Sequence, residues 1–174
     1  MRIRPATIDD AMAIARVHVD TWRSTYRGIV SDAYLDGLNY EARTEGWRQI
    51  LTNPGPGGGV FVAEDAAGVY GFAACGPRRD GPAEYTGELY AIYVLKDRQQ
   101  KGTGRALVRA CVERLRQNGM HTLCLWALEE NPARRFYDRL GGVVVARQIS
   151  EIGGKELPEV CYGWLDPSGL AAES

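Results

Sequence analysis

A glycine-punctuated segment, Gln99-Gln100-Lys101-Gly102-Thr103-Gly104-Arg105, is the stretch of this sequence best suited to bind an anion. It follows the apolar run 89–95 and precedes an amphipathic segment, so the pattern predicts a strand, a tight loop and a helix. Unpaired backbone N–H groups at the start of a helix attract anions, most often a phosphate. Gly102 and Gly104 lack a Cβ, which allows the backbone to approach such a ligand closely. The segment therefore predicts a site for a nucleotide-like cofactor.

The spacing of the glycines excludes two common phosphate-binding motifs. A P-loop requires the pattern Gly-x-x-x-x-Gly-Lys-Ser/Thr, which does not occur in this sequence. A dinucleotide-binding loop has a third glycine and follows the first strand of an alternating βαβ unit. Here the third glycine is absent and the preceding strand is about the fourth. The loop therefore serves another class of phosphate-containing ligand.

Length and charge favour one globular domain that binds neither nucleic acid nor a membrane. The chain has 174 residues, of which 45% are hydrophobic and 25% charged, and a formal net charge of -1. Such a chain has no bulk positive field to attract nucleic acid or an acidic membrane surface. Basic residues nevertheless flank the loop, where they either attract an anionic ligand or form a solvated helix face. They are Arg98, Lys101, Arg105 and Arg109.

Cysteine spacing and the N-terminal sequence indicate the compartment. Cys75, Cys111, Cys124 and Cys161 show no metal-site spacing, and we expect them to be buried thiols in a reducing cytosol. The first residues lack an apolar signal region, and no apolar run approaches membrane-spanning length. We therefore expect a cytoplasmic protein without a metal cofactor.

Hydrophobic periodicity and turn residues predict the elements that must position the loop. Their order describes an α/β (α+β) fold with a mixed sheet and helices on both faces. The expected strands are residues 2–6, 60–65, 69–75, 88–95, 123–128, 143–150 and 159–165. The expected helices are residues 11–26, 31–38, 40–51, 104–118 and 132–140. We expect one domain over residues 1–166 and a loose tail over residues 167–174.

One combination of motifs resembles a known family. The pattern Gln99-x-x-Gly102-x-Gly104 follows Ile92-Tyr93-Val94, and a further strand then leads to Phe136-Tyr137 on a short helix. This combination resembles the GNAT superfamily of acetyl-CoA-dependent N-acetyltransferases, most specifically over residues 87–142 and more loosely over almost the whole chain. The resemblance implies a mostly antiparallel sheet of about seven strands, splayed between the fourth and fifth, with helices on both faces.

The resemblance also implies which residues hold acetyl-CoA. Amides of residues 99–105 would bind the pyrophosphate, and the pantetheine arm would bond to the strand backbone near Tyr93 and Val94. The Val94 N–H would point at the thioester oxygen. The full implied set is Ile92, Tyr93, Val94, Gln99, Gln100, Lys101, Gly102, Thr103, Gly104, Arg105, Asn131 and Tyr137.

Two positions depart from the family pattern. The family often has an asparagine three residues before the position of Ala133, where this sequence has Glu130, with Asn131 one residue closer. Asn131 therefore either contacts the pantetheine or caps the helix before Pro132. Gln100 stands where the family frequently has glycine.

Acetyl transfer to an amine needs a base and benefits from an acid. An alkyl ammonium has a pKa of about 10.4, so roughly one in a few thousand is nucleophilic at pH 7. The family places a tyrosine hydroxyl near the coenzyme A sulfur, which makes Tyr137 the candidate acid for the leaving thiolate. The alternative is a core tyrosine, because Tyr137 lies on an apolar helical stripe with Phe136 and Leu140.

Glu88 is the candidate base. It opens the strand 88–95 on the same alternating face as Tyr90, Ile92 and Val94, where a carboxylate is unexpected among apolar neighbours. The alternative is a glutamate that faces solvent at the strand end. Glu84 or a chain of water molecules could also serve as the base.

Aromatic residues are the candidates for the amine pocket. Trp22, Tyr26, Tyr85 and Tyr90 could line it, or they could be core residues at helical and strand spacing. His18 lies alone on an apolar helix face, which is typical of a core histidine. The sequence does not separate amino acids, antibiotics, polyamines, small toxins or a protein N-terminus as the acceptor.

The function predicted from these residues is transfer of an acetyl group from acetyl-CoA to the primary amine of a small molecule. The alternatives are a non-catalytic acyl-CoA-binding regulatory module and an enzyme that acetylates a protein N-terminus or lysine. The expected partners are acetyl-CoA and an amine, without nucleic acid or membrane. Formation of a homodimer stays open.

Overall fold

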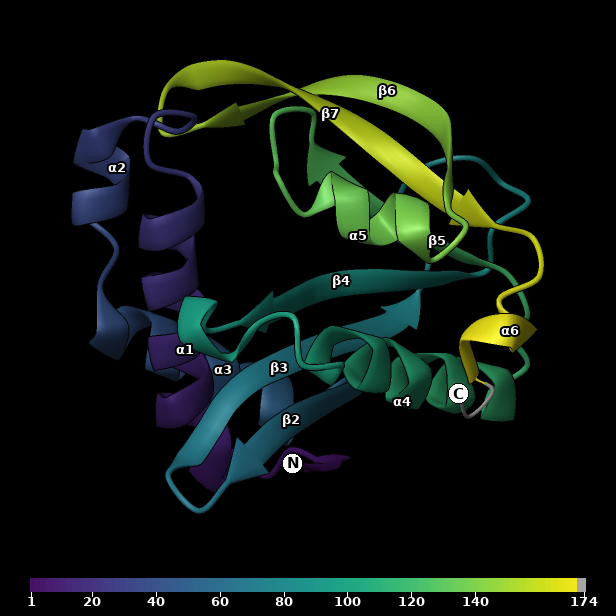
Figure 1. Cartoon of the computed structure of the whole chain (residues 1–174), viewed down its shortest axis with the longest axis horizontal. Coiled ribbons are helices and arrows are strands. Elements are labelled where there is room, and N and C mark those ends of the chain that lie inside the picture. Colours follow the sequence, from purple (N-terminus) through teal and green to yellow (C-terminus); the bar gives the residue numbers. More distant parts are fainter. Residues whose placement is uncertain (172–174) are drawn as a thin grey trace.

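The computed structural model describes residues 1–171, which form one seven-stranded sheet with helices on both faces (Figure 1). The strand order is β1-β2-β3-β4-β5-β7-β6, and every neighbouring pair is antiparallel except β4 and β5. The strands are β1 (Arg2–Pro5), β2 (Gly59–Asp65), β3 (Gly68–Pro77), β4 (Gly87–Val94), β5 (Leu123–Leu128), β6 (Val143–Ile152) and β7 (Lys155–Trp164). This architecture confirms the predicted fold class.

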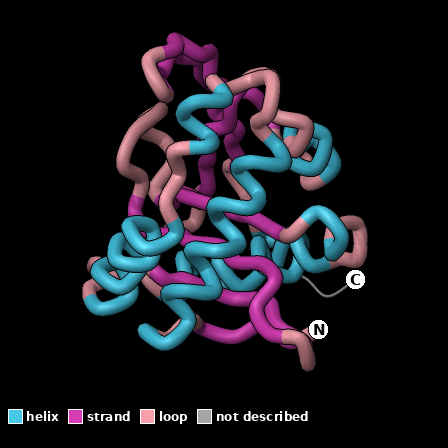
Figure 2. Tube along the Cα trace, turned by 90° about the vertical axis from the view of Figure 1, so that its left-hand side faces the viewer, coloured by secondary structure: helices cyan, strands magenta, loops and turns pink. Residues whose placement is uncertain are grey.

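Two layers of helices cover the sheet. One side buries apolar residues of α1 and α3 against β2 and β3, and the other side buries α4 and α5 against the central strands. Figure 2 shows the molecule from the side of α1, α2 and α3, with strands behind these helices. The helices are α1 (Ala11–Thr25), α2 (Asp32–Asp36), α3 (Tyr40–Thr52), α4 (Thr103–Gln117), α5 (Arg134–Arg139) and α6 (Ser168–Ala171), with 3-10 turns at Ile8–Asp10 and Lys96–Arg98. Among residues 1–171, no helix is long and apolar enough to cross a membrane.

The central pair of strands separates soon after it begins. β4 and β5 pair only at Gly87 with Leu123 and at Glu88 with Cys124, after which the strands diverge (Figure 1). β5 instead pairs with β7 along all six of its residues. The predicted splay between the fourth and fifth strands is therefore confirmed.

A β-bulge in β4 changes which side chains share a face. Ala91 pairs with Ala74 and Leu89 pairs with Cys75, so Tyr90 has no partner in β3. Tyr90 and Ala91 consequently both pack on the α1 and α3 side, whereas Leu89 packs on the α4 side. The prediction that Glu88 and Tyr90 share a face with Ile92 and Val94 is wrong, because the inserted residue shifts the alternation by one position.

The other differences lie at element ends. α5 begins at Arg134 rather than at Pro132, because the side chain of Asn131 accepts a hydrogen bond from the Ala133 N–H (2.8 Å) and forms a turn first. β7 begins at Lys155, four residues earlier than expected, because positive φ angles at Gly153 and Gly154 close a two-residue hairpin turn. All four cysteines are buried and free, as predicted.

The last residues include a short helix. Leu170 in α6 is buried in the apolar cluster beneath α4. The expectation of a tail over residues 167–174 extends beyond the described part of the chain, which ends at residue 171.

The loop between β4 and α4 contains one strained position. Gln100 has a φ of 62°, a left-handed conformation that L side chains rarely adopt, and it is the one non-glycine residue with positive φ among residues 1–171. Replacement by glycine removes the Cβ clash. We expect Gln100→Gly to raise the free energy of unfolding by about 1 kcal/mol in urea denaturation.

Lys101→Gly is the matched control for this change. Lys101 is the adjacent exposed residue and does not have a positive φ. Its replacement should lower stability by about 0.5–1 kcal/mol through the added entropy of the unfolded chain. Equal losses in both variants would show that the conformation of Gln100 carries no strain.

Candidate active site

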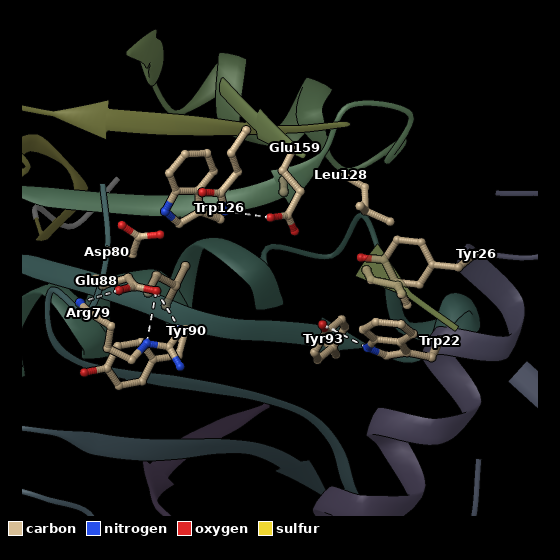
Figure 3. A pocket seen from close by; sticks show the side chains of 14 residues that line it. Trp22, Tyr26, Arg79, Asp80, Glu88, Tyr90, Tyr93, Trp126, Leu128 and Glu159 are labelled. Carbon is tan, nitrogen blue, oxygen red and sulfur yellow. Dashed lines mark hydrogen bonds and ion pairs between the residues drawn. The ribbon is translucent and has the colours of Figure 1, made fainter. Parts of the chain in front are cut away.

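A cavity of about 460 Å³ lies where β4 and β5 diverge (Figure 3). Side chains from α1, the loop after β3, β4, β5 and the β6–β7 hairpin surround it, so five separate segments of the chain build one site. The lining residues are Trp22, Tyr26, Arg79, Asp80, Glu88, Leu89, Tyr90, Tyr93, Trp126, Ala127, Leu128, Gln148, Ile152 and Glu159. Trp22, Tyr26 and Tyr90 thus line one cavity. Tyr85 does not, because it packs in a separate cluster with Cys124 and Cys161.

Glu88 lies at one end of the cavity and is almost fully buried, with 3% of its surface exposed. Its Oε1 accepts hydrogen bonds from the Arg79 side chain through Nη2 (2.6 Å) and Nε (3.3 Å). Its Oε2 accepts the Arg79 backbone N–H (2.8 Å). The alternative of a solvent-facing glutamate is therefore wrong.

Arg79 is a site residue that the sequence does not single out. Its guanidinium lies over the ring of Tyr90, 3.9 Å from the ring centre, in addition to its ion pair with Glu88. Its third nitrogen, Nη1, donates to no residue among those described, and the side chain is 61% exposed. Arg79 therefore offers a positive donor at the mouth of the cavity. No motif surrounds it, so only the folded loop after β3 reveals its position.

The opposite end of the cavity is aromatic. The Trp22 indole N–H donates to the Tyr93 hydroxyl (3.0 Å), and Trp22 and Tyr26 pack with ring centres 4.7 Å apart. Burial raises the pKa values of Tyr26 and Tyr93, so both hydroxyls stay protonated at neutral pH. The aromatic end therefore presents neutral polar groups in an apolar wall.

His18 lies behind this wall. It stacks on Tyr93 with ring centres 5.0 Å apart, and its Nδ1 accepts the Trp47 indole N–H (3.2 Å). Burial, and to a smaller extent the nearby positive charge of Arg43, lower the pKa of His18 to about 3. The imidazole is therefore neutral at physiological pH. The prediction of a core histidine is confirmed.

Tyr137 lies on α5 and packs between the rings of Phe136 and Tyr162, with centres 5.6 and 5.5 Å away. It is 6% exposed and belongs to the apolar cluster beneath α4. Burial, and then the neighbouring hydroxyls of Tyr93 and Tyr162, raise the pKa of its own hydroxyl. Tyr137 therefore packs as a core residue and keeps its proton well above neutral pH.

The diverging edge of β4 presents backbone groups to the gap. The Leu95 N–H donates to the Tyr70 carbonyl in β3 (3.0 Å). Because peptide groups alternate sides along a strand, the N–H groups of Ile92 and Val94 point away from β3, toward the gap. The Val94 carbonyl accepts the side-chain amide of Gln99 (2.9 Å), which ties the loop to this edge.

The loop and the start of α4 place further N–H groups beside that edge. The first helical hydrogen bond runs from the Ala106 N–H to the Gly102 carbonyl. The N–H groups of Thr103, Gly104 and Arg105 precede it and have no acceptor within the helix. Gly104 also packs against Phe136, where a Cβ would lie 3.1 Å from the ring. The absence of a side chain there thus allows α4 and α5 to pack closely.

The basic residues around the loop divide into two groups. Arg98 pairs with Asp65 and lies over the Tyr70 ring, so it braces the loop against β2 and β3. Lys101 and Arg105 are exposed beside the start of α4. These two side chains are therefore placed to attract an anion.

Asn131 is 7% exposed and links two elements of the site. Its side-chain oxygen forms the turn before α5, and its Nδ2 donates to the Tyr26 hydroxyl (3.0 Å). The N-cap of α5 is Ala133, so Asn131 forms the preceding turn and the expected cap at Asn131 is wrong. An amide nitrogen carries two hydrogens, so one donor remains on this side chain.

Glu159 and Trp126 line the cavity although the sequence does not single them out. Each stands alone in an ordinary strand, and only the pairing of β5 and β7 brings them together. Glu159 accepts hydrogen bonds from Gln148 (2.9 Å) and Ser150 (2.5 Å). The Trp126 indole N–H is buried and has no acceptor among the described residues.

Comparisons with known proteins agree with this geometry. The model of the acetyltransferase (GNAT) family matches residues 18–142. An uncharacterised N-acetyltransferase of Bacillus subtilis, YuaI, is 43% identical over 169 residues, which cover 97% of this chain and 95% of YuaI. An L-methionine sulfoximine/L-methionine sulfone acetyltransferase of Pseudomonas aeruginosa is 31% identical over 168 residues, covering 94% and 89%.

A solved structure leads to the same family. The putative acetyltransferase yncA of Salmonella typhimurium, determined with its cofactor acetyl-CoA, superposes with a TM-score of 0.70 at 25% identity, covering 95% of this chain and 94% of that one. The open strand edge and the loop that carries the Gln99-x-x-Gly102-x-Gly104 pattern are thus parts of an acetyl-CoA-dependent transferase, and the chain belongs to the GNAT family of acetyltransferases.

Proposed function

We propose that this enzyme transfers the acetyl group of acetyl-CoA to the primary amine of a small molecule that also carries a carboxylate, as an α-amino acid does. The observation that carries the proposal is the Arg79–Glu88 pair, which places a free cationic donor and a buried carboxylate side by side in the cavity. A volume of about 460 Å³ suits a small ligand. Methionine sulfoximine and methionine sulfone, in the name of the Pseudomonas aeruginosa relative, are α-amino acids.

The residues present fit acetyl-CoA, which supplies the acetyl group as a thioester. The N–H groups of Thr103, Gly104 and Arg105 suit the pyrophosphate at the helix start. The edge of β4 from Ile92 to Val94 suits the amide groups of the pantetheine arm, as an added strand would. The remaining Nδ2 donor of Asn131 serves the same arm. Gln99, Gln100, Lys101 and Gly102 complete the loop that encloses the phosphates.

The N–H groups of Ile92 and Val94 also suit the thioester oxygen. Negative charge develops on this oxygen as the amine attacks, and a fixed backbone donor stabilises that charge without having to reorganise. The family resemblance implies this role for Val94, and Ile92 shares its orientation in the strand.

Glu88 is the proposed base. Its two oxygens accept three hydrogen bonds from Arg79, and a carboxylate has about four acceptor positions, so room for one more donor remains. With the acceptor's carboxylate on Arg79 Nη1, the amine next to it comes close to Glu88. Glu88 then takes the proton of the ammonium, directly or through water.

Tyr137 is the proposed acid. Its raised pKa keeps the hydroxyl protonated, so the group can donate a proton to the departing thiolate. A thiolate with a pKa of about 8.5 is already a fair leaving group, so the expected contribution of this acid is moderate.

Replacement of Tyr137 by phenylalanine tests the acid. We expect Tyr137→Phe to lower kcat by about 10- to 100-fold, because the proton donor is lost while the ring still packs against Phe136 and Tyr162. Thiol release from acetyl-CoA measures kcat, and calorimetry measures coenzyme A binding, which should change less than about twofold. An unchanged kcat would remove Tyr137 from the mechanism.

Replacement of Glu88 by glutamine tests the base. Glutamine keeps the size of the side chain but cannot accept the proton, so we expect kcat to fall by about 100-fold. Glu84→Gln is the matched control, because Glu84 is exposed and is the other carboxylate that the sequence offers as a base. A large loss in Glu84→Gln with none in Glu88→Gln would transfer the role to Glu84. Thermal unfolding checks that both variants fold.

The substrate class is tested by two acceptors that differ only in the carboxylate. We expect kcat/KM for methionine sulfone to exceed that for its decarboxylated amine by at least about tenfold, because only the amino acid can bind Arg79. Arg79→Gln should reduce this difference. Equal use of both amines by the unaltered enzyme would contradict the proposal.

A further inference from the structure

The carboxylate of Glu159 lies in the same cavity and has no role in the reaction proposed above. It comes from β7, in the wall formed by the β6–β7 hairpin, whereas Glu88 comes from β4. Figure 3 shows Glu159 pointing into the cavity between Trp126 and Leu128, away from Glu88 and Arg79. The two carboxylates therefore approach a bound molecule from different sides.

Glu159 is held in place by one of its two oxygens. Its Oε2 accepts hydrogen bonds from the amide of Gln148 (2.9 Å) and from the hydroxyl of Ser150 (2.5 Å), both in β6. No residue among those described donates to its Oε1. Two fixed donors on one oxygen restrict the rotation of the carboxylate, so the other oxygen remains free to accept a hydrogen bond from a ligand.

The charge of Glu159 is not neutralised by the protein. Arg79 pairs with Glu88, and it is the one cation among the residues that line the cavity. Glu159 is half-buried, its hydrogen-bond donors are neutral, and it takes part in no ion pair with the described residues. A half-buried carboxylate without a cation disfavours a second negative charge nearby and favours a donor.

We propose that Glu159 selects the acceptor by its side chain, favouring side chains that end in an N–H donor and rejecting those that end in a carboxylate. The inference rests on the proposed function, in which Arg79 binds the α-carboxylate of the acceptor amino acid and Glu88 faces its amine. The side chain of such an amino acid then extends across the cavity toward Tyr26, Leu128 and Glu159. Apolar and aromatic neighbours there strengthen the effect of a single charge.

Three amino acids of similar size test this selection. Glutamine ends in an N–H donor, methionine in a neutral group without one, and glutamate in a carboxylate. We expect kcat/KM of the unaltered enzyme, measured by thiol release from acetyl-CoA, to be at least about 30-fold higher for glutamine than for glutamate.

Glu159→Gln should reduce this glutamine-to-glutamate ratio of kcat/KM by at least about tenfold, because kcat/KM for glutamate rises. The kcat/KM for methionine should change by less than about twofold. Glu159→Asp keeps the charge and should keep the rejection of glutamate. Glu156→Gln, in the exposed part of the same strand, is the control and should leave the ratio unchanged. If Glu159→Gln does not fold, Glu159→Ala carries the same expectation for the ratio.

Two results would overturn the inference. A ratio that is unchanged in Glu159→Gln would show that this carboxylate does not contact the side chain. An equal loss with all three amino acids would show that Glu159 acts on the reacting amine or supports the hairpin. If the unaltered enzyme acetylates none of the three, the proposed function itself fails, and that result differs from an active enzyme with an unchanged ratio.

Discussion

The early separation of β4 from β5 is the constraint on which the site depends. The two strands pair only up to Glu88 and Cys124, so the peptide groups of Ile92 and Val94 face a gap instead of a neighbouring strand. Backbone donors and acceptors inside a protein need partners. These peptide groups have no strand partner at the gap, and the same divergence opens the cavity beside it.

The bulge at Tyr90 connects that gap to the cavity. Before the bulge, Glu88 faces the cavity, and after it the side chains of Ile92 and Val94 turn toward α4. The strand thus presents the carboxylate of Glu88 to the cavity and peptide groups to the gap within a few residues. Arg79 supports this arrangement, because it pairs with Glu88 and stacks on Tyr90 at the same time.

The β6–β7 hairpin sets the remaining wall of the cavity. Its two-residue glycine turn fixes the register that places Gln148 opposite Glu159. A slip of one residue would turn Glu159 to the other face of the sheet and remove its two hydrogen bonds. The position of Glu159 in the cavity therefore depends on the register of this hairpin.

The sequence by itself determined the seven strands, the main helices and the glycine loop at the start of α4. These features follow from local periodicity, turn residues and the family pattern. Only the tertiary structure decided the bulge at Tyr90, the contact of Arg79 with Glu88 and the place of Glu159. Each depends on strand pairing or on contacts between distant segments, and such long-range packing leaves no local pattern in the sequence.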